Sequence, residues 1–236
     1  MDLMEFLYRV MEEMSDAGIP IVFKGAMVLN LVIRENNPSK VERMTRDIDG
    51  DWVGEFPTME EMEKALRKAV KKVDSSLDVQ VNRIFGERKS AGFKIANEIG
   101  EKIASIDISV RQNRFSSRYI SYVNGVSITG ASLSKMLSDK IYAISGQNVC
   151  RRMKDVLDIY IMSFITKINA DELYQIWRET GRELGDFEAY KTQIAELGEA
   201  YNKMKGIKNK PEFFEVYNRV NDIVSCFECQ REKTYY

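Results

Sequence analysis

The sequence contains no histidine among its 236 residues. Histidine is the side chain that most often moves protons near neutral pH, and it is also a frequent metal ligand. Acid–base or metal chemistry in this chain must therefore use carboxylates, lysine, tyrosine or cysteine. Cysteine is scarce as well, and its odd count of three argues against a disulfide framework.

Long apolar runs and a strong excess of charge are also missing. No apolar run approaches the length of a membrane span, and the acidic, amphipathic N-terminus lacks the pattern of a signal peptide. The net charge is only −1, so any nucleic-acid site must be a local basic patch. We expect a cytoplasmic protein with no membrane partner and no DNA partner.

The hydrophobic pattern changes near residue 130. Before this point, period-two patterns predict strands at residues 19–23, 44–53, 78–85, 92–99 and 102–110. Helical periodicity predicts helices over residues 2–17 and 26–33, and a third helix after Thr58. Asn124-Gly125 is a hairpin signal. After Gly130 we expect helices alone, beginning near Ser132, Val149, Asp171, Gly185 and Pro211.

This pattern predicts an α+β protein with two domains. Residues 1–130 would form a mixed β-sheet flanked by helices, and residues 131–236 would form a C-terminal helical bundle. A length of 236 residues suffices for one large domain or two small ones.

The first group of candidate functional residues lies between Lys24 and Asp49. Gly25 ends the first predicted strand and permits a tight turn into a helix, where backbone amides can meet a phosphate. Asp47 and Asp49 are two residues apart in a predicted strand, so their carboxylates share one face. Two such carboxylates can hold Mg²⁺. The alternative is an exposed strand face, or a turn that begins at Gly50-Asp51.

Asp107 is a stronger signal than the Asp47/Asp49 pair. It lies in the apolar strand IASIDISV, between Ser105 and Ser109 on the same face. An acid there suggests a polar cleft, and a third carboxylate could complete a metal site for phosphoryl or nucleotidyl transfer.

A second group of candidates lies in the helical half. Lys140 falls on an otherwise apolar helical stripe, so it either extends to solvent or directs its charge at a phosphate. Arg151, Lys154, Asp155 and Asp158 share one face of the next predicted helix. Taken alone, this pattern favours a solvated charged face.

Together these residues resemble a known family. KGA, RMTRDIDGD, the strand aspartate Asp107 and then SLSKMLSDKIYAI and RRMKDVLDIY are similar to the AbiEii/AbiGii nucleotidyltransferase toxins of the DNA polymerase β-like superfamily. The resemblance covers roughly residues 19–165, and it rests on the combination of motifs.

The resemblance implies roles for the matching residues. Asp47, Asp49 and Asp107 would hold two Mg²⁺ ions, with Asp107 also placed to accept the acceptor's proton. Lys24, Gly25, Ala26, Lys140, Arg151 and Asp158 would contact the nucleotide, and Asp155 would be a further catalytic acid. Arg43 and Thr45 would support the site from the residues before Asp47.

The implied activity is transfer of a nucleoside monophosphate from a nucleoside triphosphate to a tRNA 3′ end or a protein hydroxyl. The biological setting would be a toxin restrained by a cognate antitoxin, acting in abortive infection or phage defence. Two alternatives remain open. The acceptor could be a small molecule such as an antibiotic, or the chain could be a nucleotide-binding module without turnover. Ala26 favours the latter, because it lacks the hydroxyl often found at this position in the superfamily.

Overall fold

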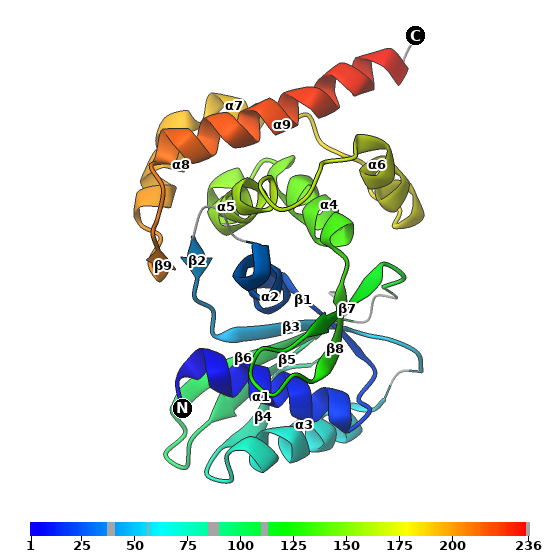
Figure 1. The fold of residues 1–236 in the computed structure, drawn as a ribbon, viewed down its shortest axis with the longest axis vertical. Coiled ribbons are helices and arrows are strands. Elements are labelled where there is room, and N and C mark those ends of the chain that lie inside the picture. The colour runs from blue at the N-terminus through cyan, green and yellow to red at the C-terminus, as the bar shows by residue number, and fades with distance from the viewer. Residues whose placement is uncertain (37–40, 56, 85–89, 110–112, 235–236) are drawn as a thin grey trace. The chain divides into compact units, whose positions relative to one another are not determined.

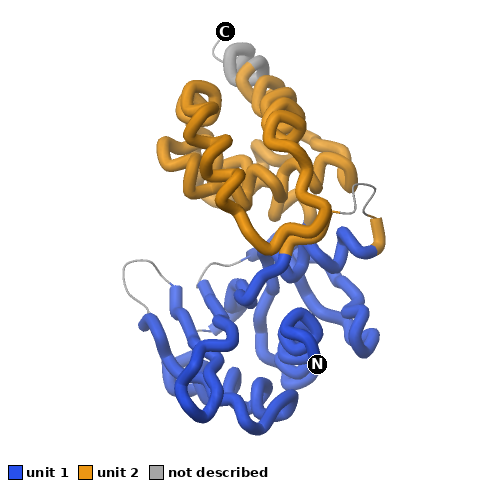
Figure 2. The backbone as a smooth tube through the Cα atoms, turned by 90° about the vertical axis from the view of Figure 1, so that its left-hand side faces the viewer, with its two compact units in different colours: residues 1–34, 44–132 blue, residues 35–43, 133–236 orange. Residues whose placement is uncertain are grey.

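A computed structural model describes residues 1–36, 41–55, 57–84, 90–109 and 113–234, with the backbone alone from residue 229 onward. Figure 2 colours its two compact units. The first unit, called the sheet unit below, contains residues 1–34 and 44–132. The second, the helical unit, contains residues 35–43 and 133–236. The helical unit thus takes in residues 35–43, and the proposed domains 1–130 and 131–236 stay a prediction.

The sheet unit is built on a mixed sheet whose described strands have the order β4-β5-β6-β3-β1-β8-β7. The strands are β1 (Ile21–Lys24), β3 (Asp47–Trp52), β4 (Asp78–Arg83), β5 (Ser90–Ala96), β6 (Lys102–Ser109), β7 (Ser116–Ile120) and β8 (Ser127–Ala131). Its helices are α1 (Leu3–Asp16), α2 (Gly25–Asn36) and α3 (Met59–Val73). β3 pairs in parallel with β6 and antiparallel with β1. The predicted α+β fold is confirmed.

Strand alternation separates a core face of the sheet from a polar one. Ile48, Ile106 and Ile108 are fully buried. The aspartates that alternate with them, Asp47, Asp49 and Asp107, are partly exposed. Helices α1 and α3 pack against each other and lie together below the sheet in Figure 1. The N-terminus of α3 carries the predicted cap, a reciprocal box between Thr58 and Glu61.

The helical unit contains α4 (Leu133–Ile144), the 3₁₀ helix η1 (Val149–Arg152), α5 (Met153–Met162), α6 (Ala170–Glu179), α7 (Glu188–Thr192), α8 (Ile194–Asn202) and α9 (Phe213–Thr234). Its core is rich in rings, with Trp177 packed edge-on against Tyr174 and Phe227. No helix within the described ranges is long and apolar enough to cross a lipid bilayer.

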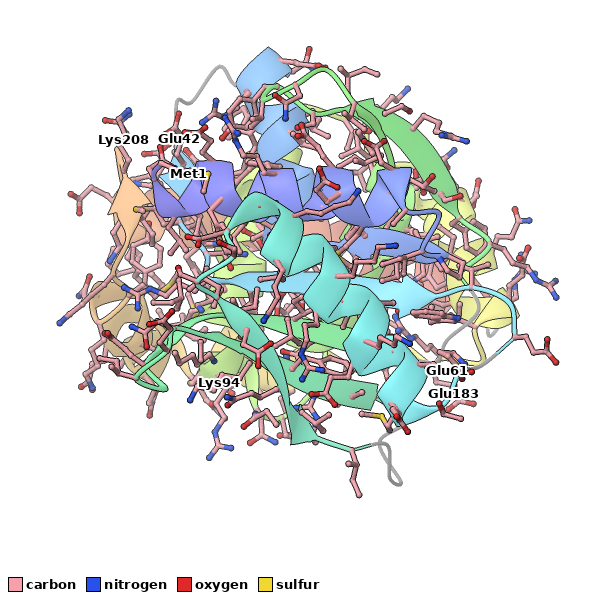
Figure 3. All side chains as sticks on the ribbon, turned by 90° about the horizontal axis from the view of Figure 1, so that it is seen from below. Met1, Glu42, Glu61, Lys94, Glu183 and Lys208 are labelled. Atoms are coloured by element: carbon pink, nitrogen blue, oxygen red, sulfur yellow. The ribbon has the colours of Figure 1, made fainter. Side chains whose placement is uncertain are left out.

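The prediction that no strand follows Gly130 is wrong. β9 (Ile207–Lys208) pairs antiparallel with β2 (Glu42–Arg43). Glu42 and Lys208 lie side by side in Figure 3, with 3.7 Å between carboxylate and ammonium. Strands of two residues are too short to show alternation in a sequence, and their pairing joins segments that are distant along the chain.

Several predicted boundaries also shift. The strand expected over residues 44–53 begins at Asp47, and the helix expected from Gly185 begins at Glu188. The single helix expected over residues 149–166 is divided into η1 and α5 and ends at Met162. The C-terminal ends expected for the strands at residues 78–85 and 102–110 lie outside the described residues.

Candidate functional site

The register between β3 and β6 brings the predicted aspartates together. Asp47 lies opposite Ser105, and Asp49 lies opposite Asp107. Partners in register on neighbouring strands project to the same face, and the two backbones are about 4.8 Å apart. Asp47, Asp49 and Asp107 therefore share one face of the sheet, called the carboxylate face below.

Gly25 lies directly beside this face, where β1 ends and α2 begins. Its φ of +70° is in the left-handed region, which glycine adopts without strain. A Cβ atom at this position would lie 2.6 Å from Oδ2 of Asp49. Glycine therefore allows the start of α2 to approach the carboxylate closely. The next residue, Ala26, is buried within α2.

Lys24 is paired with an acid that the sequence reasoning did not select. Its ammonium donates to the carboxylate of Asp51 and, over 2.9 Å, to Oγ of Ser109. Asp51 is buried and also accepts from Ser109 and, over 3.1 Å, from Nδ2 of Asn113. The signal for Asp51 was present, because it continues the alternation that begins at Asp47 and Asp49.

The carboxylate face suits Mg²⁺ in its donor atoms and register. Oxygen ligands are those that Mg²⁺ prefers, and three carboxylates on one face need a counter-charge. As placed, Asp47 accepts from Oγ of Ser105, and Asp107 accepts from Nη2 of Arg83 at 2.6 Å. In the part of the chain that the structure describes, no three acidic or cysteine side chains converge closely enough to hold a metal ion. A metal bound by all three aspartates would require their carboxylates to converge more closely than they do here.

The second group of predicted residues forms a buried charge cluster in the helical unit. Arg43 of β2 donates two bonds to the carboxylate of Asp158, at 3.0 and 2.9 Å. Nζ of Lys140 donates to Asp158 at 2.6 Å and to Asp155 at 3.3 Å. The Asp158 side chain is 1% exposed and that of Lys140 is 9% exposed. Asp155 is partly exposed, with 23% of its side chain accessible.

Burial and charge act against each other in this cluster. Burial would raise the pKa of Asp158, but Lys140 and Arg43 attract its negative charge and hold the pKa below its usual value. Burial would lower the pKa of Lys140, but Asp158 and Asp155 raise it above its usual value. Both groups are therefore charged near neutral pH.

This burial corrects two interpretations of the sequence. Lys140 does not extend to solvent, because its ammonium lies between two carboxylates. Asp158 does not lie on a solvated face. Arg151 and Lys154, by contrast, are exposed. Periodicity could not separate these cases, because the partner that covers Asp158 comes from β2.

The other predicted supporting residue, Thr45, lies at the edge of the carboxylate face. Its Oγ1 accepts a hydrogen bond of 3.2 Å from the backbone N–H of Asp47. The carboxylate face and the charge cluster belong to different units. A cleft that would combine them into one site stays a prediction.

Comparison with known proteins agrees with this fold. JHP933 from Helicobacter pylori is 14% identical, with a TM-score of 0.52, over 98% of this chain and 94% of that one. A proposed nucleotidyltransferase from H. pylori is 10% identical, with a TM-score of 0.55, over 97% and 94%. At this identity the likeness shows the fold alone. No curated protein sequence matches the chain significantly.

The class and the family follow from these findings. The chain shares its fold with both of these solved structures. The family model described as "Nucleotidyl transferase AbiEii toxin, Type IV TA system" matches residues 6–215, which is most of the chain. The chain belongs to the AbiEii nucleotidyltransferase toxin family, and it is a nucleotidyltransferase.

Proposed function

We propose that the enzyme transfers a nucleoside monophosphate from a nucleoside triphosphate to an acceptor hydroxyl and releases pyrophosphate, with Mg²⁺ as cofactor. The observation that carries this proposal is the parallel register of β3 and β6, which sets Asp49 opposite Asp107, with the α2 turn at Gly25 against Asp49. Nucleotidyl transfer needs these parts: a metal site, a phosphate-binding turn and a base for the attacking hydroxyl.

The residues of the sheet unit would have separate roles in the reaction. When bound, Mg²⁺ would neutralise phosphate charge and orient the phosphates. Asp47 and Asp49 would hold the metal, and Asp107 would accept the proton of the attacking hydroxyl. Backbone N–H groups at the start of α2 would meet the phosphates at Gly25 and Ala26.

The helical unit would position its own polar groups. Because Arg43 and Lys140 balance the buried Asp158, the cluster can hold the partly exposed Asp155 in a fixed place. Lys140 would act on the nucleotide phosphates indirectly, through the carboxylates that its ammonium holds. The exposed Arg151 can contact a phosphate directly. These roles extend the family resemblance, and each can be tested by substitution.

We further propose that the acceptor is a tRNA 3′ end or a protein hydroxyl, and that a cognate antitoxin restrains the toxin. The outcome would be growth arrest, which would serve in phage defence. The support is membership of a toxin family of Type IV toxin–antitoxin systems. Growth arrest on expression of the wild type, relieved by Asp47→Asn, would agree with this setting.

The experiment is incubation of the full chain with each α-labelled nucleoside triphosphate, Mg²⁺ and total tRNA, followed by separation of RNA from protein. We expect label in one macromolecular fraction with the wild type, and its loss with Asp47→Asn and Asp49→Asn. Retained transfer in both variants would refute the mechanism. Label on a small molecule would favour an antibiotic-type acceptor. Mg²⁺-dependent nucleotide binding without transfer to any acceptor would favour a binding module.

A further inference from the structure

Arg83 on the edge strand β4 reaches Asp107 two strands away. β5 lies between β4 and β6, and its residue Gly92 pairs with Arg83 on one side and with Asp107 on the other. A Cβ atom at Gly92 would lie 3.1 Å from Oδ1 of Asp107 and 3.4 Å from Cζ of Arg83. The missing side chain therefore leaves the space through which the guanidinium reaches Asp107.

A β-bulge turns Arg83 toward this space. Val81 pairs with Phe93, but the next pair along the strands is Arg83 with Gly92, so two residues of β4 advance against one residue of β5. Without the bulge, Arg83 would lie opposite Ala91 and share the face of the buried Phe93. Bulges commonly redirect a side chain in this way.

The ion pair occupies one carboxylate oxygen of Asp107, a proposed metal ligand. Nη2 of Arg83 lies 2.6 Å from Oδ1 of Asp107, which is the register partner of Asp49. The two side chains are 42% and 37% exposed, so water screens their attraction and the pair is weak. A divalent cation carries twice the charge of the guanidinium, and it would compete with Arg83 for this carboxylate.

We propose that Arg83 is a positioning residue that holds Asp107 when no metal is bound and competes with the divalent metal for it. This inference rests on the proposed function, because it requires the metal to bind at the carboxylate face. Arg83 supplies a counter-charge to Asp107, the register partner of Asp49, before the metal arrives.

Binding of Mn²⁺, in place of Mg²⁺, to the full chain without nucleotide tests the proposal. The electron paramagnetic resonance signal of free Mn²⁺ measures how much is bound, independently of activity. Arg83→Gln should lower the dissociation constant about fivefold, because removing the competitor releases roughly the energy of an exposed ion pair. Arg67→Gln is the matched control: it removes the same charge from a side chain 38% exposed, paired with Glu63 and Asp78.

The outcomes separate the two proposals. Mn²⁺ binding that tightens in Arg83→Gln clearly more than in Arg67→Gln supports the competition. Mn²⁺ binding that is no tighter in Arg83→Gln than in Arg67→Gln overturns the inference. If wild-type binding still depends on Asp47 and Asp49, the metal site itself remains supported. Wild-type binding that does not change in Asp47→Asn or Asp49→Asn refutes the metal site, and the inference with it.

Discussion

The carboxylate face and the buried charge cluster use the same kinds of side chain under opposite conditions. On the sheet, the Arg83–Asp107 pair is more than a third exposed on both sides. In the helical unit, Asp158 is almost wholly buried and has two cationic partners. Water screens the attraction within the first pair, whereas little water reaches the second group.

This difference assigns different tasks to the two regions. Exposed charges can change partners at small cost, as a site must when metal, nucleotide and product come and go. Buried charges cannot lose a partner without a large penalty, so they fix geometry. Breaking one pair in each region should therefore give very unequal effects.

The largest effect on stability is expected from Asp158→Asn. Removing this carboxylate leaves Arg43 and Lys140 as buried cations with one acid fewer, which should lower the free energy of unfolding by about 3–5 kcal/mol. Urea denaturation followed by circular dichroism measures the change. The control Glu199→Gln removes an exposed partner of Lys203 and should change stability by less than about 0.5 kcal/mol. Similar small losses in both variants would contradict the buried cluster.

The same difference in stability should depend on pH. Because the pKa of Asp158 is lowered in the folded state, its contribution is fully present above the unfolded-state pKa of about 3.9 and is lost as the pH falls through the folded value. The pKa of Lys140 is raised, so its contribution is present below about pH 10.4 and is lost at higher pH. Denaturation of the wild type and Asp158→Asn across pH should show a steady gap from about pH 5 to pH 9 that narrows in acid. A gap that widens in acid would have the wrong sign.

An intermediate effect is expected from Gly25→Ala. Alanine at a φ of +70° costs about 1–2 kcal/mol, and its Cβ would meet the Asp49 carboxylate. Gly18→Ala is the control, because φ is +68° there but nothing lies within 4 Å of the added atom. Both variants should lose similar backbone stability in thermal denaturation, and Gly25→Ala alone should also lose nucleotide transfer. Equal nucleotide transfer by the two variants would show that the α2 turn is not part of the site.

The smallest effect on stability is expected from Arg83→Gln. The exposed pair with Asp107 should contribute less than about 1 kcal/mol to folding. Chemical denaturation should therefore leave this variant close to the wild type while its affinity for Mn²⁺ changes. A loss as large as that in Asp158→Asn would show that Arg83 has a structural role.

Local sequence patterns predicted the sheet unit better than the charge cluster. Alternation was enough to place Asp47, Asp49 and Asp107 on strands, and their shared face followed once β3 and β6 paired in parallel. The helix cap at Thr58 and the turn containing Asn124-Gly125 are also local and were expected. Alternation, the cap and the turn depend on residues close together in the chain, whereas the pairing of β3 with β6 does not.

The burial of Lys140 and Asp158 could not be read from the sequence. It depends on Arg43, which donates to Asp158 from β2. β2 in turn pairs with β9, which lies far away in the sequence. The placement of Arg83 depends on a bulge, which exists only in the register between β4 and β5. Long-range pairing decides both features, and helical or strand periodicity in one segment carries no information about it.

The most direct test of the carboxylate face compares Asp107→Asn with Asp78→Asn in a single-turnover assay of nucleotide transfer. Both variants remove one partly exposed strand carboxylate paired with an arginine. Asp78, however, lies on the edge strand β4, away from Asp49, and its partner is Arg67 of α3. We expect Asp107→Asn to slow transfer at least about 100-fold, as loss of a general base does, and Asp78→Asn to stay within about twofold of the wild type. Equal rates for the two variants would contradict the proposed site.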